Sequence, residues 1–267
     1  MVRKYSDNSD VFVAWDRLQI FLSNMSGHSK WAKVHRQKTI TDAKRGAVFT
    51  KLGNLITVAA KEDGGDLESN FKLRLAVEKA RTANMPKDNI ARAIKRGAGT
   101  GSDKLILEEI TYEGFGPGGS AFVVEAITDN KNRTVAEVKS AFSKNGGQLA
   151  GPNSVLWQFE RRGLIYLESE QLKNKKLEQL ELDLIDAGAQ DIKKGAEEWE
   201  IVTAPDRLQA VEKNIGSLNL DISESLLGYR AKEEITVTNE AVLEKINKLY
   251  GTLDEVDDIS NIYTNIN

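Results

Sequence analysis

The sequence predicts an α+β protein of three domains: a helical N-terminal domain and two small α+β sandwiches, the third domain being inserted in the second. Two observations predict this fold class. Apolar residues recur every three or four positions up to about residue 98, whereas after residue 104 the pattern changes to short alternating strands. The chain has 267 residues, which is enough for three small domains that each bury a core.

The composition excludes several classes of protein. No apolar stretch approaches the roughly 18 to 20 residues that a membrane-spanning helix needs. The absence of cysteine excludes disulfides, thiolate metal sites and cysteine nucleophiles, and two histidines, His28 and His35, are too few for a His-rich zinc site. We therefore expect a cytoplasmic protein without a metal or cofactor, and we do not expect most familiar hydrolase chemistry.

Three helices are predicted in the N-terminal domain. Apolar stripes mark the first two, formed by Val48, Leu52, Leu55, Ile56 and Ala59, and by Leu73, Ala76, Val77 and Ala80. Pro86 opens the third helix, because proline suits the first helical turn, and Asp88 complements the positive end of that helix. Residues 97–102 are rich in glycine and predict a flexible linker.

The second domain is predicted as a ββαββ series. Its elements are strands at 107–115 and 120–128 with a turn at 116–119, a helix around 134–142, and strands at 155–160 and 164–167 with a turn at 161–163. The third domain has a helix at 172–187, a strand pair at 191–204, a helix opened by Pro205 and a strand at 233–238. We expect a helix at 240–250 and a strand at 261–265 to fold back onto the second domain.

These elements define the predicted domain boundaries, with residues 25–99 as the basic helical domain, 100–170 and 236–267 as the α+β domain, and 171–235 as the inserted α+β domain. Residues 1–24 lack a signal-peptide core, because Asp16 and Arg17 divide their apolar pieces. We interpret them as an extension. A start of translation at Met25 is a hypothesis that the intact mass of the native protein tests.

Charge is distributed unevenly along the chain. The net charge of −3 combines a net charge of +9 over residues 25–100, which hold 16 basic and 7 acidic residues, with −12 over residues 101–267. Lysine and arginine side chains neutralise phosphates, and an indole ring stacks on a base, so the basic domain favours nucleic acid over an ordinary solvated surface. The candidate nucleic-acid-binding residues are His28, Lys30, Trp31, Lys33, Arg36, Lys38, Lys44, Arg45, Lys51, Lys87, Arg92, Lys95 and Arg96. Trp31 is equally compatible with a buried helix anchor, and the choice between RNA and DNA stays open at this point.

Residues 114–119 match the spacing of a dinucleotide-binding glycine motif, but their context predicts a tight turn instead. A dinucleotide loop connects a strand to a helix, whereas this one connects two strands and contains Pro117, which lacks a backbone donor. The acidic residues of the second half of the chain are interpreted as a solvated face without a catalytic role.

Several longer motifs resemble those of the YebC/PmpR family. They are Gly27–Trp31, Asp42–Gly46, Phe49–Leu52, Asn84–Ile90, Arg92–Lys95, Tyr112–Gly119 and Thr128–Thr134. The resemblance runs from Met25 to the C-terminus, with small departures such as Leu67, where relatives often have proline. It implies three domains, with two ferredoxin-like or α+β sandwich domains, and a non-enzymatic function.

Members of this family are described as DNA-binding transcriptional regulators, while the related mitochondrial translational activator of cytochrome oxidase and some bacterial members act on the ribosome. The resemblance therefore implies either a ribosome- or ribosomal-RNA-associated translation factor that relieves stalling, such as at proline runs, or a transcriptional regulator. We favour the former, because the dispersed basic residues show no evident helix-turn-helix recognition helix. The acidic second and third domains would then contact ribosomal proteins. A protein-interaction module with non-specific affinity for nucleic acid is a third interpretation.

Overall fold

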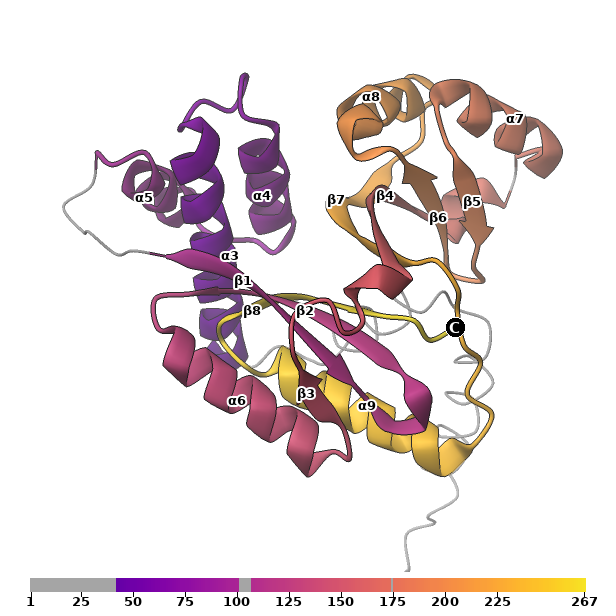
Figure 1. The fold of residues 1–267 in the computed structure, drawn as a ribbon. Coiled ribbons are helices and arrows are strands. Elements are labelled where there is room, and N and C mark those ends of the chain that lie inside the picture. Colours follow the sequence, from indigo (N-terminus) through magenta and orange to yellow (C-terminus); the bar gives the residue numbers. More distant parts are fainter. Residues whose placement is uncertain (1–41, 101–106, 174) are drawn as a thin grey trace, which may run out of the picture.

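The structure is a computed structural model that describes residues 42–100, 107–173 and 175–267 (Figure 1). It contains a helical domain and two antiparallel four-stranded sheets with helices, which confirms the predicted α+β class. Within the described residues, no helix has the length and apolar character needed to cross a membrane.

The helical domain consists of α3 (Asp42–Asp63), α4 (Phe71–Thr82) and α5 (Lys87–Gly97). The predicted apolar stripes meet in one core, in which Ile56, Leu73 and Val77 are almost fully buried. Asn70 caps α4 by accepting a hydrogen bond from the Leu73 backbone N–H at 2.9 Å. Its amide also donates to the carbonyl of Ala59 at 2.8 Å, so this one buried side chain fixes the start of α4 against α3.

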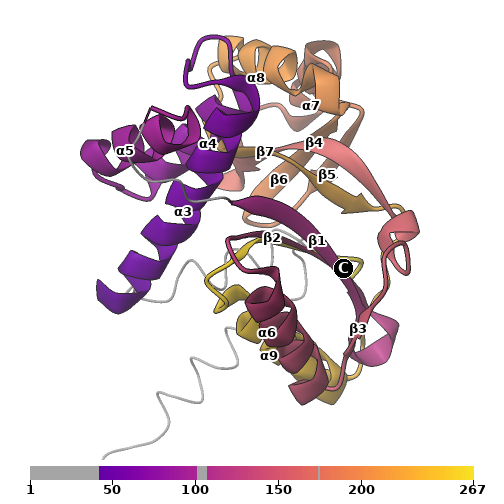
Figure 2. The same ribbon diagram turned by 60° about the vertical axis from the view of Figure 1, so that its left-hand side comes forward.

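The first sheet has the strand order β3-β1-β2-β8. Its strands are β1 (Glu108–Phe115), β2 (Ala121–Thr128), β3 (Gln148–Ala150) and β8 (Ile259–Thr264). Both helices of this domain, α6 (Lys131–Lys144) and α9 (Glu240–Asp254), pack on one face of the sheet (Figures 1 and 2). Alternate residues of β2, among them Phe122 and Val124, point into this core because side chains along a strand alternate between the two faces.

The second sheet has the strand order β5-β6-β4-β7. Its elements in sequence order are β4 (Phe159–Glu168), α7 (Leu177–Ala187), β5 (Asp191–Lys194), β6 (Glu198–Thr203), α8 (Leu208–Ser217) and β7 (Ile222–Ala231). This βαββαβ succession with β4 and β6 in the centre is the ferredoxin-like arrangement. The first sheet does not share it. The four strands of the second sheet, β4 to β7, all lie between β3 and β8 in the sequence. The second sheet is therefore inserted between two strands of the first sheet.

Two sequence expectations are wrong in this region. Residues 159–168 form one continuous strand of the second sheet, whereas the sequence suggested two strands of the second domain and a boundary at residue 170. Gly163 lies within this strand. A Cβ there would lie 2.6 Å from the Thr203 side chain and 3.0 Å from Leu208 Cβ, so a glycine at this position allows α8 to pack closely. The last strand of this sheet is β7, about ten residues before the predicted strand at 233–238.

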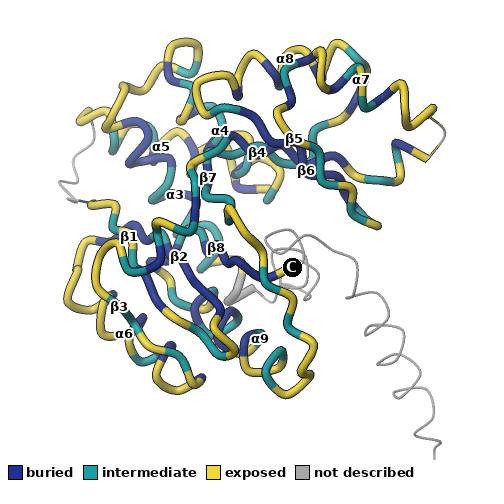
Figure 3. Tube along the Cα trace, turned by 45° about the vertical axis from the view of Figure 1, so that its right-hand side comes forward, coloured by how far each residue is buried: buried dark blue, intermediate teal, exposed yellow. Residues whose placement is uncertain are grey.

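The other face of the first sheet is covered by the remaining two domains. Val123 and Tyr263 on this face pack with Phe159 of the second sheet, while Ile127 packs with Val58 of α3. Figure 3 shows the resulting buried stretch along β2, which is covered on both sides. The helical domain and the inserted domain are thus held next to each other on one sheet.

Candidate nucleic-acid interface

Helix α5 presents the predicted basic face. Ile90 and Ala93 are buried against the rest of the helical domain, so the opposite side of the helix faces solvent. The structure places four of the predicted cations on this helix: Lys87, Arg92 and Lys95 are exposed, and Arg96 is half-buried. Among the described residues, none of these four forms an ion pair with a carboxylate. The Arg92 guanidinium donates hydrogen bonds to Asn89 and to the Asp88 carbonyl, which orients it along the helix.

Close contact with α3 fixes the orientation of α5. A Cβ on Gly97 would lie 2.1 Å from the carbonyl oxygen of Thr57, so only glycine allows the two helices to approach this closely. The Thr57 hydroxyl lies 2.7 Å from the Gly53 carbonyl and 3.2 Å from the Ala93 carbonyl. The basic face therefore stands on a rigid helix rather than on a loop.

Helices α4 and α5 are connected by a short turn. The two helices are joined by residues 83–86, and Asn84 takes a left-handed conformation with φ 59°. Figure 1 looks nearly along α5, whereas α3 and α4 lie in the plane of the picture, so α5 crosses the other two helices. A connection of this length is also found in helix-turn-helix units.

Basic residues of α3 and α4 have other roles. The Lys51 ammonium lies 2.5 Å from the main-chain carbonyl of Asp254 in α9, and burial lowers the pKa of this lysine. Lys79 forms an ion pair of 3.2 Å with Glu224 of the second sheet. The structure therefore places Lys51 in a contact between domains and not on the basic face. Arg81, exposed in the last turn of α4, is a further cation that the sequence analysis omitted, although basic residues are common in the last turn of a helix.

The remaining candidates cannot be placed on this face. His28, Lys30, Trp31, Lys33, Arg36 and Lys38 lie outside the described residues, as does the side chain of Lys44. Arg45 is exposed in the second turn of α3. Among the described candidates, the structure brings together the four on α5.

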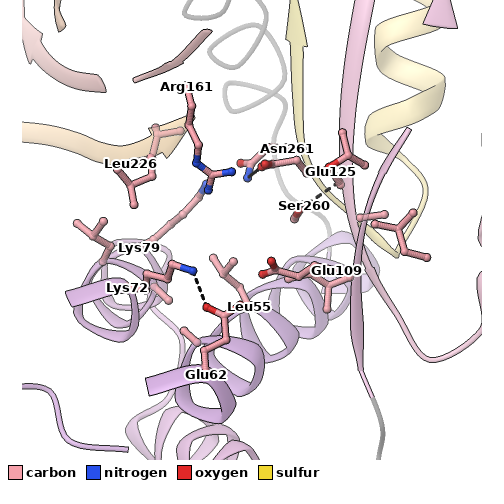
Figure 4. A pocket seen from close by; sticks show the side chains of 18 of the residues that line it. Leu55, Glu62, Lys72, Lys79, Glu109, Glu125, Arg161, Leu226, Ser260 and Asn261 are labelled. Atoms are coloured by element: carbon pink, nitrogen blue, oxygen red, sulfur yellow. Dashed lines mark hydrogen bonds and ion pairs between the residues drawn. The ribbon is translucent and has the colours of Figure 1, made fainter. Parts of the chain in front are cut away.

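A polar cavity of about 180 Å³ lies where the three domains meet (Figure 4). Arg161 of β4 and Glu109 of β1 point into it, and Lys72 of α4 reaches Glu62 of α3 at 2.5 Å on its edge. Burial raises the pKa of Glu109. The sequence analysis missed this cavity because its residues come from seven separate segments, and it had assigned Arg161 to a turn.

The glycine motif forms a turn, as predicted. Gly118 and Gly119 have φ values of 71° and 77° in a short turn between the antiparallel strands β1 and β2. The Gly116 backbone N–H donates to the Ser120 carbonyl at 2.7 Å, so it closes the turn instead of facing a phosphate. Within the described part of the chain, no group of three or more potential metal ligands occurs.

Together these features define a three-domain α+β protein whose helical domain presents a basic helix. Two family models match the chain: the TACO1/YebC protein N-terminal domain over residues 29–100, and the TACO1/YebC second and third domain over residues 107–266. The chain belongs to the TACO1/YebC family, which confirms the resemblance found in its motifs.

Similar proteins cover nearly the whole chain. A probable transcriptional regulatory protein of Thermoanaerobacter pseudethanolicus is 45% identical over 244 residues, which are 91% of this chain and 97% of that protein. A protein of the same description from Thermotoga maritima is 43% identical, over 90% of this chain and 93% of that one. The crystal structure of a conserved hypothetical protein from Aquifex aeolicus has a TM-score of 0.77 at 38% identity, and covers 85% of this chain and 91% of that chain.

Proposed function

We propose that this protein is a non-enzymatic regulator of gene expression that binds nucleic acid through the exposed face of α5. The observation that carries the proposal is the set of four basic residues on one rigid helix, none of them neutralised by a described carboxylate. Such cations displace the counterions of a phosphate backbone on binding, which gives affinity without sequence information.

Duplex DNA is the target that the observations support best. The relatives are named probable transcriptional regulatory proteins, and α5 follows α4 after a turn of helix-turn-helix length. A helix of 11 residues is roughly 16 Å long and fits the major groove, which is about 12 Å wide. Transcriptional regulation is therefore the leading function, in place of the translation factor that the sequence analysis favoured.

A translation factor on the ribosome is the second candidate, and helix α7 is the observation that favours it. This helix carries four acidic residues and no basic ones. On its outer side Leu182 and Ile185 are 56% and 55% exposed, which is unusual for large apolar side chains. An acidic surface with an apolar centre complements the basic surfaces of ribosomal proteins, and α7 belongs to the inserted domain, at a distance from α5 (Figure 1).

One experiment separates the two functions. The protein is sedimented with ribosomes through a sucrose cushion at near-physiological salt, and titrated in the same buffer against promoter-length duplex DNA of several sequences. Sequence-dependent binding to duplex without ribosome association is expected for a transcriptional regulator. Stoichiometric sedimentation with ribosomes and weak, sequence-independent duplex binding would instead support the translation factor. Binding to neither would contradict the proposal that α5 is a nucleic-acid interface.

A further inference from the structure

A second, larger cleft of about 910 Å³ opens between the helical domain and the two sheets. Helices α3 and α4 form one wall, α8 and β7 form the opposite wall, and the ends of α9 and β8 form the floor. Apolar side chains of all three parts line it, among them Val48, Leu75 and Ile222. Its size is that of a site for a polypeptide segment or a sizeable ligand.

The charged lining of this cleft is predominantly acidic. The described lining residues include six acidic ones, Glu78, Glu212, Glu224, Asp254, Glu255 and Asp257, and four basic ones, Lys51, Arg74, Lys79 and Lys213. Three of these four cations already have protein partners: Lys51 bonds to the Asp254 carbonyl, Arg74 to the Leu67 carbonyl, and Lys79 to Glu224. Six acidic and four basic residues leave the described lining with a net charge of −2, which favours a cationic occupant over a nucleic acid.

Two details describe the charged groups of the cleft. Burial raises the pKa of Glu212 on α8, and the carboxylate of Glu78 on the opposite wall raises it as well, while the Arg74 guanidinium acts in the opposite direction. A cation placed between these two side chains would lower the energy of both ionised carboxylates. On the floor, the ammonium of Lys51 is already bound at the C-terminal end of α9, beside Asp254 and Asp257.

The chain itself supplies a segment of matching chemistry. Residues 25–41 contain four basic residues and no acidic ones, together with the apolar Trp31, Val34 and Ile40. This segment continues directly into α3, whose early turns provide Ala47 and Val48 to the cleft wall. Its 17 residues reach up to about 60 Å when extended, so chain length does not limit where along the cleft they lie.

We propose that the acidic cleft holds residues 25–41 of the same chain when no nucleic acid is bound. Nucleic acid then competes with the cleft for these cations, so the cleft lowers the affinity of the free protein for non-specific phosphate backbones. The docking itself stands on the charges and position of the cleft. The competition rests on the proposed function.

Cross-linking tests the docking without nucleic acid. The chain has no cysteine, so a pair of introduced cysteines reports on one contact only. The pair Ala32→Cys with Thr82→Cys joins the middle of the segment to the cleft wall, and the control pair Ala32→Cys with Ser143→Cys joins it to the exposed side of α6, on the far face of the first sheet. We expect the first pair to form a disulfide at least about ten-fold faster, through its higher effective concentration. Equal rates would overturn the docking.

Neutralising the cleft tests the competition. The double variant Glu78→Gln with Glu212→Gln is expected to bind duplex DNA several-fold more tightly than the unaltered protein, because the basic segment is released. The matched control, Glu137→Gln with Glu244→Gln, removes the same charge from exposed positions of α6 and α9. An equal gain in both variants would show a general charge effect and overturn the competition. If the unaltered protein binds no nucleic acid, the proposed function fails, and the cross-linking rates alone decide the docking.

Discussion

The hydroxyl of Thr134 donates a hydrogen bond of 2.6 Å to Oδ2 of Asp258, joining the start of α6 to the residue before β8 across 124 positions of sequence. The same carboxylate accepts from Thr128 at 3.0 Å and from the Arg133 guanidinium at 2.9 Å. This arrangement gives the 128–134 motif a structural role, because its hydroxyls and guanidinium all converge on one buried acid. These hydrogen bonds to Asp258 attach β8, which follows the inserted domain in the sequence, to the rest of the first sheet.

Replacing Asp258 with alanine is therefore expected to lower the free energy of unfolding by about 2–4 kcal/mol, since it removes a buried acceptor that two hydroxyls and a guanidinium share. The matched control is Asp129→Ala. Asp129 also pairs with Arg133, at 2.9 Å, but is exposed, so its loss is expected to cost less than about 1 kcal/mol. Urea denaturation of both variants checks this. Equal losses would contradict a special role for Asp258.

Glu113 supports the crossing between the two sheets. Its buried carboxylate accepts hydrogen bonds from the backbone N–H groups of Asn153, Val155 and Leu156 at 2.6, 2.8 and 2.7 Å. In Glu113→Ala these three amides lose their acceptor, and we expect destabilisation by about 2–3 kcal/mol. Hydrogen exchange of the three amides is the direct measurement, and it should accelerate in this variant while the amides of α6 keep their protection. Unchanged exchange in the loop would show that other groups order it.

Local patterns allowed part of this fold to be predicted. The stripes of α3 and α4 follow the helical period, and the turn at 116–119 has the glycines that positive φ values require, so both were evident from neighbouring residues. The basic face of α5 was also predictable, because Pro86 fixes the start of the helix and its period then separates Ile90 from Arg92.

Long-range contacts were not predictable in this way. Gly163 looks like a turn residue until Thr203 and Leu208, some 40 positions later, are seen to occupy the space of its side chain. The sequence around Lys51 is that of an exposed cation, and its contact with the end of α9 depends on a residue about 200 positions later. The cavity and the cleft are formed by segments from three domains. Local sequence patterns do not predict which segments of different domains lie next to each other.

The close approach of α5 to α3 predicts opposite effects for two glycine substitutions. Gly97→Ala places a methyl group 2.1 Å from the Thr57 carbonyl and 2.7 Å from Ala60 Cβ, so the helices must separate, and we expect a loss of about 2–3 kcal/mol. In Gly46→Ala the new methyl has no atom within 4 Å, and the higher helix propensity of alanine should stabilise α3 by up to about 1 kcal/mol. Thermal denaturation of both variants tests the pair. Similar shifts of the melting temperature in both would contradict the close packing.

The pKa of Glu109 gives the cavity a pH dependence. Burial raises this pKa above its ordinary value of 4.5, and the carboxylates of Glu62 and Glu125 raise it further. The ionised side chain is therefore less favourable in the folded state than in the unfolded state. Glu109→Gln should therefore raise the melting temperature at pH 7. The gain in the free energy of unfolding should be less than about 1 kcal/mol, because the side chain is partly exposed.

This advantage should shrink as the pH falls through the raised pKa, because the unaltered Glu109 then takes up a proton in the folded state. Melting temperatures between pH 7 and pH 4 measure the trend. Glu137→Gln, at an exposed position of α6, serves as the control and should show no such convergence. A difference between Glu109→Gln and the unaltered protein that stays constant with pH would contradict the assignment.

The basic face of α5 is tested by the salt dependence of binding. Replacing Arg92, Lys95 and Arg96 together by glutamate removes three cations from one helix face, so binding to duplex DNA should weaken for all sequences. Because each lost phosphate contact changes the slope of log K against log salt by about 0.7–0.9, the slope should flatten by up to roughly 2 to 3.

The control for this variant makes the same charge change at Lys139, Lys144 and Lys248, which are exposed on α6 and α9, on the far face of the first sheet. Since charges separated by more than about 10 Å are largely screened at physiological salt, the control should lose little affinity and keep its slope. Titrations at four or more salt concentrations measure both quantities. An unchanged slope in the α5 variant, or an equal change in the control, would mean that the phosphates are bound elsewhere on the molecule.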